Sequence, residues 1–328
     1  MNILNRARHA AGLALALTLA CALPSTASAA YPDRAVRLVV PFSAGGPTDA
    51  LARVISEYMS KELGENMVVE NRGGAGGRIA TEFAASAPAD GYTVFFATTG
   101  TMAINPALYR SMTLNPVQAF DAVGAIASSW NVLIVLPTFP AHNLQELVAL
   151  ARKQPGALTF GSAGNGSTNH LSGELLRLST GIDIRHVPYK GSAGALVDLL
   201  GGRLSMMFDT IPAEVQNIQT GRVRALAQTG PERSEALPDV PTMVEAGIPG
   251  FDVTTFFGLV TPKGTPPEAR ERLHQALLKI LSEDKVKKAL AGLGAVPIPG
   301  SQQDFETLIN AEIVKWGKLV KDSGASID

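Results

Sequence analysis

The sequence alternates short apolar runs with segments of helical periodicity, and this alternation restricts the fold more than any other feature. Such a succession is typical of an α/β fold in which helices cover mostly parallel strands. The expected strands are 37–41, 67–70, 93–98, 131–136, 158–161, 184–187, 206–209, 224–228 and 257–260. The expected helices are 47–63, 77–87, 143–154, 167–180, 192–201, 212–220, 266–291 and 302–322.

Residues 1–30 have the pattern of a cleavable export signal. Two arginines form a positive n-region, and the apolar run after them is too short to span a bilayer. Ala27-Ser28-Ala29 fits the small-x-small cleavage rule. Cys21, the sole cysteine, raises a lipoprotein alternative, but Thr18 occupies the position where a lipobox normally has leucine. We therefore expect export, and a mature chain with no thiol or disulfide.

Composition and charge exclude several classes of partner. The chain is 46% hydrophobic and 17% charged, as in a globular protein. Without Arg6 and Arg8 of the signal, 26 basic residues face 29 acidic ones, a net charge of −3. This balance gives no reason to expect nucleic acid or an anionic membrane surface as partner. The histidines show neither HxxxH nor HExxH spacing, so we expect no metal and no cofactor.

The segment PFSAGGPTD, residues 41–49, joins an expected strand to an expected helix through a glycine turn. A strand, a glycine turn and a free helix N-terminus leave several backbone N–H groups unpaired, which is the arrangement of an anion site. Asp49 lies in the first turn of this helix. A carboxylate there also stabilises the helix dipole without touching a ligand, so both roles stay open.

The segment TFGSAGNGSTNH, residues 159–170, repeats this chemistry more than a hundred residues later. The helix starting near Ser167 exposes its first amides, and five residues offer side-chain donors: Ser162, Asn165, Ser167, Thr168 and Asn169. The alternative is an ordinary capped connection, but the density of glycine and serine exceeds what a cap needs. His170 is equally suited to touching a ligand and to satisfying a backbone group. NRGGAGGR, residues 71–78, lacks the spacing of a phosphate loop and predicts a turn at the cleft edge.

Two such turns far apart in the chain predict two lobes that face each other across a cleft, because ligands bind beyond the carboxyl ends of strands in open α/β sheets. Lobe 1 is expected to contain residues 31–131 and 251–328, and lobe 2 residues 132–250. Asp209 ends an expected strand at this edge, either as a ligand contact or as a helix N-cap. Phe256 is expected to meet the ligand's apolar part, since one of two adjacent phenylalanines must face away from the sheet.

An exported hydrolase is the competing interpretation. Ser162 or Ser167 with His170 would supply a nucleophile and a base. The two GSAG segments, at 161–164 and 191–194, do not match the GxSxG nucleophile elbow, and we expect no enzyme activity. A receptor whose main role is signalling is a third possibility, which no feature of the sequence separates from transport.

Several stretches together resemble the Bug-type (TctC-like) receptors, the periplasmic substrate-binding components of tripartite tricarboxylate transporters. The resemblance covers essentially the whole mature chain, in the same order. It implies a two-lobed type II periplasmic-binding-protein fold with mixed sheets, a periplasmic location, a monomer, and the transporter's membrane components as partners. The stretches are PDRAVRLVVPFSAGGPTDALAR, VVENRGGAGGRIATEFAASAPADGYT, LTFGSAGNGSTNHLSGELL, VPYKGSAGALVDLLGGRLSMMFD and LPDVPTMVEAGIPGF.

The resemblance also implies how a small carboxylate is held. In the family, backbone amides and ordered waters of two turns grip the carboxylate, and nearby side chains contribute further contacts. A site of amides and hydroxyls suits a dicarboxylate, a tricarboxylate, an aromatic acid, an acidic amino acid or a nicotinate-like compound alike. Because Asp209 would repel a citrate-like ligand and could pair with an ammonium group, we favour one anionic end and a less charged other end. The matching residues are Phe42, Ser43, Ala44, Gly45, Gly46, Asp49, Thr98, Thr99, Ser162, Ala163, Asn165, Gly166, Ser167 and Asp209.

Overall fold

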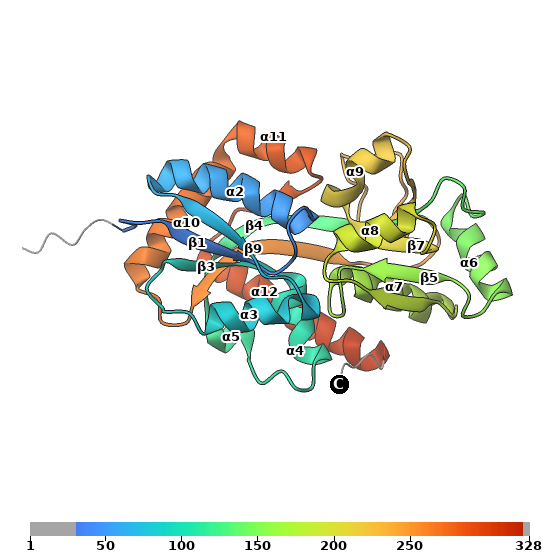
Figure 1. The fold of residues 1–328 in the computed structure, drawn as a ribbon, viewed down its shortest axis with the longest axis horizontal. Coiled ribbons are helices and arrows are strands. Elements are labelled where there is room, and N and C mark those ends of the chain that lie inside the picture. Colours follow the sequence, from blue (N-terminus) through green and yellow to red (C-terminus); the bar gives the residue numbers. More distant parts are fainter. Residues whose placement is uncertain (1–30, 324–328) are drawn as a thin grey trace, which may run out of the picture.

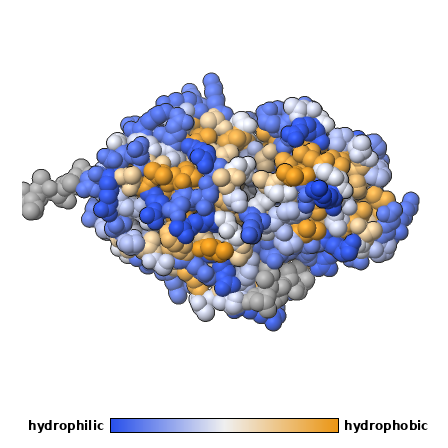
Figure 2. Space-filling view, in the orientation of Figure 1, coloured by the Kyte–Doolittle hydropathy of each residue, from blue (hydrophilic) through white to orange (hydrophobic). Residues whose placement is uncertain are grey.

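The computed structural model describes residues 31–323, so that the expected export signal, 1–30, and the last five residues lie outside the described range. Two lobes lie side by side in Figure 1. Lobe 1 is built on the strands within residues 36–98, and lobe 2 on the strands within residues 159–228. Hydrophobic residues lie in scattered patches over both lobes on the face that Figure 2 shows. Within residues 31–323, no helix has the length and apolar character needed to cross a membrane.

Lobe 1 has a mixed sheet. β1 (Val36–Val40) lies between β2 (Met67–Asn71) and β3 (Thr93–Thr98), and both pairs are parallel. β9 (Thr254–Pro262) continues the sheet antiparallel to β3, with Phe257 opposite Thr98. The apolar runs predict the parallel part; the antiparallel strands make the sheet mixed, as the family resemblance implies.

β4 (Phe120–Val135) joins the two lobes. Its residues 120–130 pair with β9, and residues 131–135 pair antiparallel with β7 (Met206–Thr210) and β8 (Arg224–Gln228) of lobe 2. β5 (Thr159–Ser162) lies parallel to β7 and β6 (Arg185–Pro188). The short β10 (Val296–Pro297) pairs with the lobe 1 part of β4. The strand expected at 131–136 therefore begins eleven residues earlier, at Phe120, and spans the junction of the lobes.

The helices mostly follow the predicted segments. One expectation is wrong: the single helix expected over 266–291 is two helices, because Glu283 adopts an extended backbone (φ −75°, ψ 129°) between them. The helices are α2 (Pro47–Leu63), α3 (Arg78–Ala85), α4 (Asn105–Leu108), α5 (Pro116–Ala119), α6 (Leu144–Lys153), α7 (Thr168–Thr180), α8 (Ser192–Leu200), α9 (Ile211–Gln219), α10 (Pro267–Ser282), α11 (Asp284–Gly292) and α12 (Gln302–Ser323), with short helical turns at Ala75–Gly77 and Gly100–Ile104.

Each lobe has a buried core on both faces of its sheet. In lobe 1, α2, α10 and α11 cover one face and α3 with the start of α12 covers the other. In lobe 2, α8 and α9 cover one face and α6 and α7 the other. α12 belongs to both lobes, because Phe305 and Ile309 pack in the core of lobe 1 while Trp316 and Val320 pack in that of lobe 2. The lobe boundaries at residues 131 and 250 stay a prediction.

Candidate functional site

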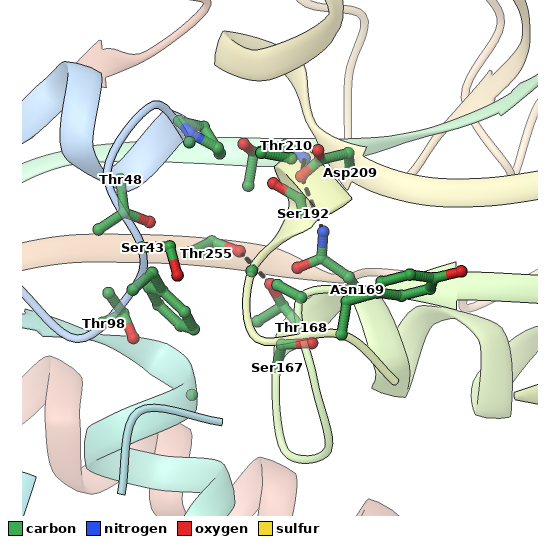
Figure 3. Close-up of a pocket in the computed structure, with 18 of the residues that line it drawn as sticks. Ser43, Thr48, Thr98, Ser167, Thr168, Asn169, Ser192, Asp209, Thr210 and Thr255 are labelled. Atoms are coloured by element: carbon green, nitrogen blue, oxygen red, sulfur yellow. Dashed lines mark hydrogen bonds between the residues drawn. The ribbon is translucent and has the colours of Figure 1, made fainter. Parts of the chain in front are cut away.

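A cavity of about 310 Å³ lies between the lobes, and loops and strand ends of both lobes form its wall. In Figure 3, Ser43, Thr48 and Thr98 lie on the lobe 1 side, and Asn169, Ser192 and Asp209 lie on the lobe 2 side. The lining residues are Phe42, Ser43, Gly46, Pro47, Thr48, Thr98, Gly100, Ala163, Ser167, Thr168, Asn169, Tyr189, Lys190, Gly191, Ser192, Ala193, Gly194, Asp209, Thr210, Thr255 and Phe257.

Four helices begin at this cavity. The first residues of α2, α7 and α8 and the N-cap residue of α9 all belong to its wall. The N-caps of α2, α8 and α9 make no side-chain capping bond, so no capping side chain occupies the N–H groups in the first turns of these helices. Pro47 in α2 and Pro212 in α9 have no N–H, and the remaining first-turn amides stay available to a ligand. Lys190 is the only basic residue of the lining, and it is exposed. Helix ends and hydroxyl groups, rather than buried cations, are therefore the groups that this cavity offers to an anion.

The first glycine turn contributes part of its length. Phe42, Ser43 and Gly46 line the cavity, whereas Ala44 and Gly45 do not. The N–H of Gly45 donates instead to Oδ2 of Asp49 at 2.9 Å.

Asp49 lies beneath the turn rather than in the cavity wall. Its Oδ1 accepts from Asn71 at 3.0 Å, and its Oδ2 accepts from Nε of Arg53 at 2.9 Å. Burial alone would raise the pKa of Asp49, but the hydrogen bonds from Arg53, Gly45 and Asn71 lower it below its usual value. Asp49 thus fixes the shape of the turn that meets the cavity.

The lobes touch at the rim beside this turn. The hydroxyl of Ser43 donates to the carbonyl oxygen of Lys190 at 3.2 Å. Gly73 lies against both, because a Cβ at this position would be 2.8 Å from Oγ of Ser43 and 3.2 Å from that carbonyl oxygen. Three segments distant in sequence therefore meet here without room for a side chain on residue 73, and the structure is that of a closed form.

In the second glycine turn, Ala163 and Ser167 line the cavity and the other predicted residues lie behind them. The carbonyl oxygen of Asn165 accepts from the hydroxyl of Tyr109 at 3.2 Å. Gly166 lies against Asn105, whose Oδ1 would be 2.1 Å from a Cβ there. These residues hold the turn against the segment after β3.

Ser162 and His170 belong to a buried cluster behind the same turn. Oγ of Ser162 lies 2.6 Å from Nε2 of His186, and the rings of His170 and His186 stack with centroids 4.1 Å apart. Nδ1 of His170 accepts from the N–H of Gly166 at 3.3 Å. Burial, and then the neighbouring His186, lower the pKa of His170 to about 3, and burial lowers that of His186 to about 4. Both rings are therefore neutral at physiological pH.

The serines do not form a hydrolase site with His170. Oγ of Ser167 donates to the carbonyl oxygen of Gly164 at 2.7 Å and accepts the backbone N–H of His170, so the imidazole does not reach it. Ser162 does pair with a histidine, His186, but Ser162 is fully buried and absent from the cavity wall. Neither serine has the base within reach and the access to substrate that nucleophilic catalysis requires.

The ends of β3 and β9 close the lobe 1 side of the cavity. Thr98 is in the wall, while Oγ1 of Thr99 accepts from the backbone N–H of Phe256 at 2.9 Å and is fully buried. Phe257, not Phe256, lies in the wall, because the side chains of a strand alternate. Phe256 packs edge-on against Phe305 at 5.5 Å on the other face of the sheet.

On the lobe 2 side, Asp209 lies in the wall with 1% of its surface exposed. Its Oδ1 accepts from Nδ2 of Asn169 and from the N–H of Thr210, both at 2.8 Å (Figure 3). The hydroxyl of Ser192, at the start of α8, also acts on Asp209 and lowers its pKa. Asp209 therefore interacts with donors at the starts of three helices, α7, α8 and α9.

The sequence analysis does not predict the third segment of the cavity wall, residues 189–194, or Thr48, Gly100, Thr210 and Thr255. A signal for the third segment exists, because KGSAG contains the start of α8 and has the same mixture of glycine and serine as the other two turns. This segment does not match the nucleophile-elbow pattern, but its composition is that of an anion-binding turn. Within residues 31–323, no cluster of three or more histidine, cysteine or acidic side chains is placed to hold a metal ion.

Comparison with known proteins identifies the family. The model of the TctC family, described as the tripartite tricarboxylate transporter family receptor, matches residues 51–325. The chain belongs to this family. A relative encoded in the tcbD-tcbE intergenic region of a Pseudomonas species is 38% identical over 318 residues, which are 97% of this chain and 94% of that protein. BugT of Bordetella pertussis is 36% identical over 90% of this chain and 91% of its own length.

Solved structures of TctC receptors have the same fold. The periplasmic binding protein BugD is 36% identical, with a TM-score of 0.87 over 90% of this chain and 99% of that one. Rpa4515 of R. palustris, solved with adipate, is 40% identical, with a TM-score of 0.87 over 90% and 98%. MatC from Rhodopseudomonas palustris, solved with malate, is 34% identical, with a TM-score of 0.85 over 88% and 100%. The predicted membership among Bug-type receptors and the predicted two-lobed fold are confirmed.

Proposed function

We propose that this TctC receptor is exported to the periplasm, closes its lobes over a small carboxylate, and delivers it as a monomer to the membrane components of a tripartite transporter. The observation that carries the proposal is the convergence of four helix N-termini from both lobes on one closed cavity. Amides at helix ends bind a carboxylate without the desolvation cost of a buried lysine or arginine.

The arrangement of the four helices also explains why a ligand would favour the closed form. α2 belongs to lobe 1, whereas α7, α8 and α9 belong to lobe 2, so a ligand that contacts both groups interacts more strongly with the closed form. A ligand shifts a conformational equilibrium only through such a difference in affinity. Reversible binding followed by release then requires no chemical step, in agreement with a receptor rather than an enzyme.

Two neighbours in the family support a carboxylate as ligand. Rpa4515 was solved with adipate and MatC with malate, and both share more than a third of their residues with this chain. In this protein Asn169 and Thr210 are already engaged by Asp209, so we infer that the main carboxylate binds elsewhere in the cavity. We place it between Ser43, Thr48 and Thr98 of lobe 1 and the uncapped start of α8 in lobe 2. The other end of the ligand then meets Asp209.

Thermal unfolding of residues 31–328 with small carboxylates and their amides tests the proposal. A ligand at a hundred times its Kd stabilises the folded state by about 2.7 kcal/mol and raises the midpoint, whereas its uncharged diamide does not. If no carboxylate in a panel that includes malate, adipate and aromatic acids shifts the midpoint, the proposal fails.

A matched pair of variants locates the anion at a helix end. Ser192→Pro removes the first amide of α8 at the one helical position where proline is tolerated, and Ser192→Ala removes only the hydroxyl. Loss of a hydrogen bond to a charged group costs about 1.5–3 kcal/mol, so Ser192→Pro is expected to weaken binding by roughly 10- to 100-fold. Equal affinities of the two variants, measured by calorimetry, would contradict a contact with this amide.

A further inference from the structure

Two buried carboxyl groups beside the cavity have no part in binding an anion at helix ends. Asp209 ends β7 in the cavity wall, and Glu214 lies behind it in the first turn of α9, with none of its surface exposed. The two carboxyl groups lie close enough for each to shift the pKa of the other. Two ionised carboxyl groups so close in a buried site repel each other, and this repulsion favours a pair that holds one proton.

The surrounding donors place this proton on Glu214. Oδ1 of Asp209 receives two hydrogen bonds, from Nδ2 of Asn169 and from the N–H of Thr210. Glu214 receives one, from Nδ2 of Asn217 to Oε2 at 3.1 Å, and its buried Oε1 finds no donor among the described residues. A proton on Oε1 turns this orphaned acceptor into a donor toward Asp209, which keeps the negative charge.

Few charged groups face the pair. From α7 it meets the amide of Asn169, while the ring of His170 stacks on another histidine. From α8 it meets the hydroxyl of Ser192, and Lys190 before this helix is exposed. The guanidinium of Arg222 also acts on Glu214 and lowers its pKa. Burial raises the pKa of both carboxyl groups, and the charge of Asp209 raises that of its neighbour further.

We propose that the Asp209–Glu214 pair makes ligand selection at this end of the cavity depend on one proton. The inference rests on the proposed function and adds the specificity of the same site. With one shared proton, the pair carries a single negative charge and accepts a ligand hydroxyl, amide or ammonium group. With two protons, the carboxyl group of Asp209 donates a hydrogen bond and can therefore bind a second carboxylate of the ligand.

The proton balance follows directly. A dicarboxylate takes up one proton from solution as it binds, and this proton resides on the carboxyl group of Asp209. The monoamide of the same dicarboxylate takes up none, because its amide N–H donates to the ionised Asp209. No other bond is formed or broken. The two ligands have nearly the same size, so their comparison isolates the charge at the distal end.

Calorimetry of each dicarboxylate from succinate to adipate, and of malate, against its monoamide tests the proposal between about pH 6.5 and 8. The Kd of a dicarboxylate is expected to rise about tenfold per pH unit, because one proton is taken up on binding, and that of the monoamide to stay within about twofold. Titration in two buffers of different ionisation enthalpy is expected to give an uptake near one proton for the dicarboxylate and near zero for the monoamide.

Two isosteric variants assign the proton to a residue. Asp209→Asn removes the titrating group and is expected to abolish both the pH dependence and the proton uptake. Glu214→Gln keeps a neutral donor behind Asp209 and is expected to retain both. The opposite pattern would overturn the assignment. Circular dichroism checks that each variant folds, and the two-buffer titration of the parent protein gives the proton count even where a variant does not.

The outcomes separate this inference from the proposed function. Dicarboxylates that bind with no pH dependence and no proton uptake overturn the role of the pair and leave the receptor function intact. The inference is also overturned if the monoamides bind but no dicarboxylate binds at pH 6.5. At this pH the pair is expected to take up the second proton and bind the dicarboxylates. Failure of both classes contradicts carboxylate binding itself.

Discussion

The stacked histidines behind the second glycine turn predict a measurable loss of stability in acid. His170 and His186 are neutral in the folded protein, where their rings stack. Protonation of His170 at Nδ1 is disfavoured, because this nitrogen accepts the N–H of Gly166. In the unfolded chain both imidazoles titrate near their ordinary pKa of 6.5. The unfolded state therefore binds more protons as the pH falls below this value, and stability falls with it.

The magnitude follows from the shifted pKa values. With folded values of about 3 for His170 and about 4 for His186, neither ring binds a proton in the folded state at pH 5. The free energy of unfolding then decreases by about 2 kcal/mol for each histidine between pH 8 and pH 5. This is a large fraction of the ~5–15 kcal/mol that typically separates a folded domain from its unfolded state.

The Asp209–Glu214 pair changes stability with pH in the opposite direction to the histidines, so measurements on the parent protein alone do not reveal the histidine contribution. The raised pKa values of Asp209 and Glu214 mean that their contribution to stability is full at low pH and is lost as the pH rises through those folded values. The two contributions oppose each other between pH 5 and pH 8. A difference between the parent and a histidine variant removes the carboxyl contribution, which both proteins share.

Urea unfolding of the parent and of His186→Gln at several pH values between 5 and 8 is the appropriate assay. Glutamine does not titrate and keeps a polar end near Ser162. The parent is expected to lose about 2 kcal/mol more than the variant over this range. His142→Gln, the same change at an exposed position, is the control and should parallel the parent. Parallel curves for His186→Gln and the parent would refute the buried neutral state of this ring.

Two further predictions concern the cavity and its closure. Phe257→Leu enlarges the cavity and is expected to shift affinity toward longer dicarboxylates in a calorimetric series. Phe256→Leu is expected to destabilise the fold and to leave the order of affinities unchanged. The same shift in both variants would contradict the assignment of the two side chains to opposite faces of the sheet. Gly76→Ala would place a Cβ 1.8 Å from the carbonyl oxygen of Asn165 in the other lobe. This variant is expected to lose more unfolding free energy and more ligand affinity than Gly181→Ala, where φ is similarly positive but the space is open. Equal losses in the two variants would show that backbone conformation alone matters.

The sequence predicted most elements because their patterns are local. The helix 47–63 and the strands 93–98 and 224–228 have the predicted bounds, since turn and helix-start residues mark their ends. The first part of β4 was missed because FDAVGAIASS is rich in alanine, glycine and serine, which have little preference for strands. The break at Glu283 was missed because apolar spacing continues from α10 into α11.

The site was predictable to the level of turns and not of side chains. Glycine and serine before a helix identified the turns that contain Ser43 and Ser167, because this composition exposes amides wherever it occurs. Which of two adjacent strand residues faces the cavity depends on pairing: Phe257 lies opposite Thr98 of β3, and no local pattern records that register. The contact of Asp209 with Glu214 likewise arises only when α9 folds back on β7.

The contacts between the lobes indicate what controls closure. At the rim, a hydrogen bond between the lobes joins the hydroxyl of Ser43 to the carbonyl oxygen of Lys190, and deeper in the cavity Thr255 donates to Thr168 at 2.8 Å. The hydroxyl of Tyr109 also donates across the lobes, to the carbonyl oxygen of Asn165. Neutral hydrogen bonds of this kind contribute about 0.5–1.5 kcal/mol each, so these hydrogen bonds by themselves hold the closed form only weakly. A carboxylate that meets amides of both lobes adds interactions of larger magnitude, because its charge is shared among several donors. We therefore expect the ligand to supply much of the free energy of closure, and we expect a proton that changes the charge of Asp209 to change which ligand can supply it.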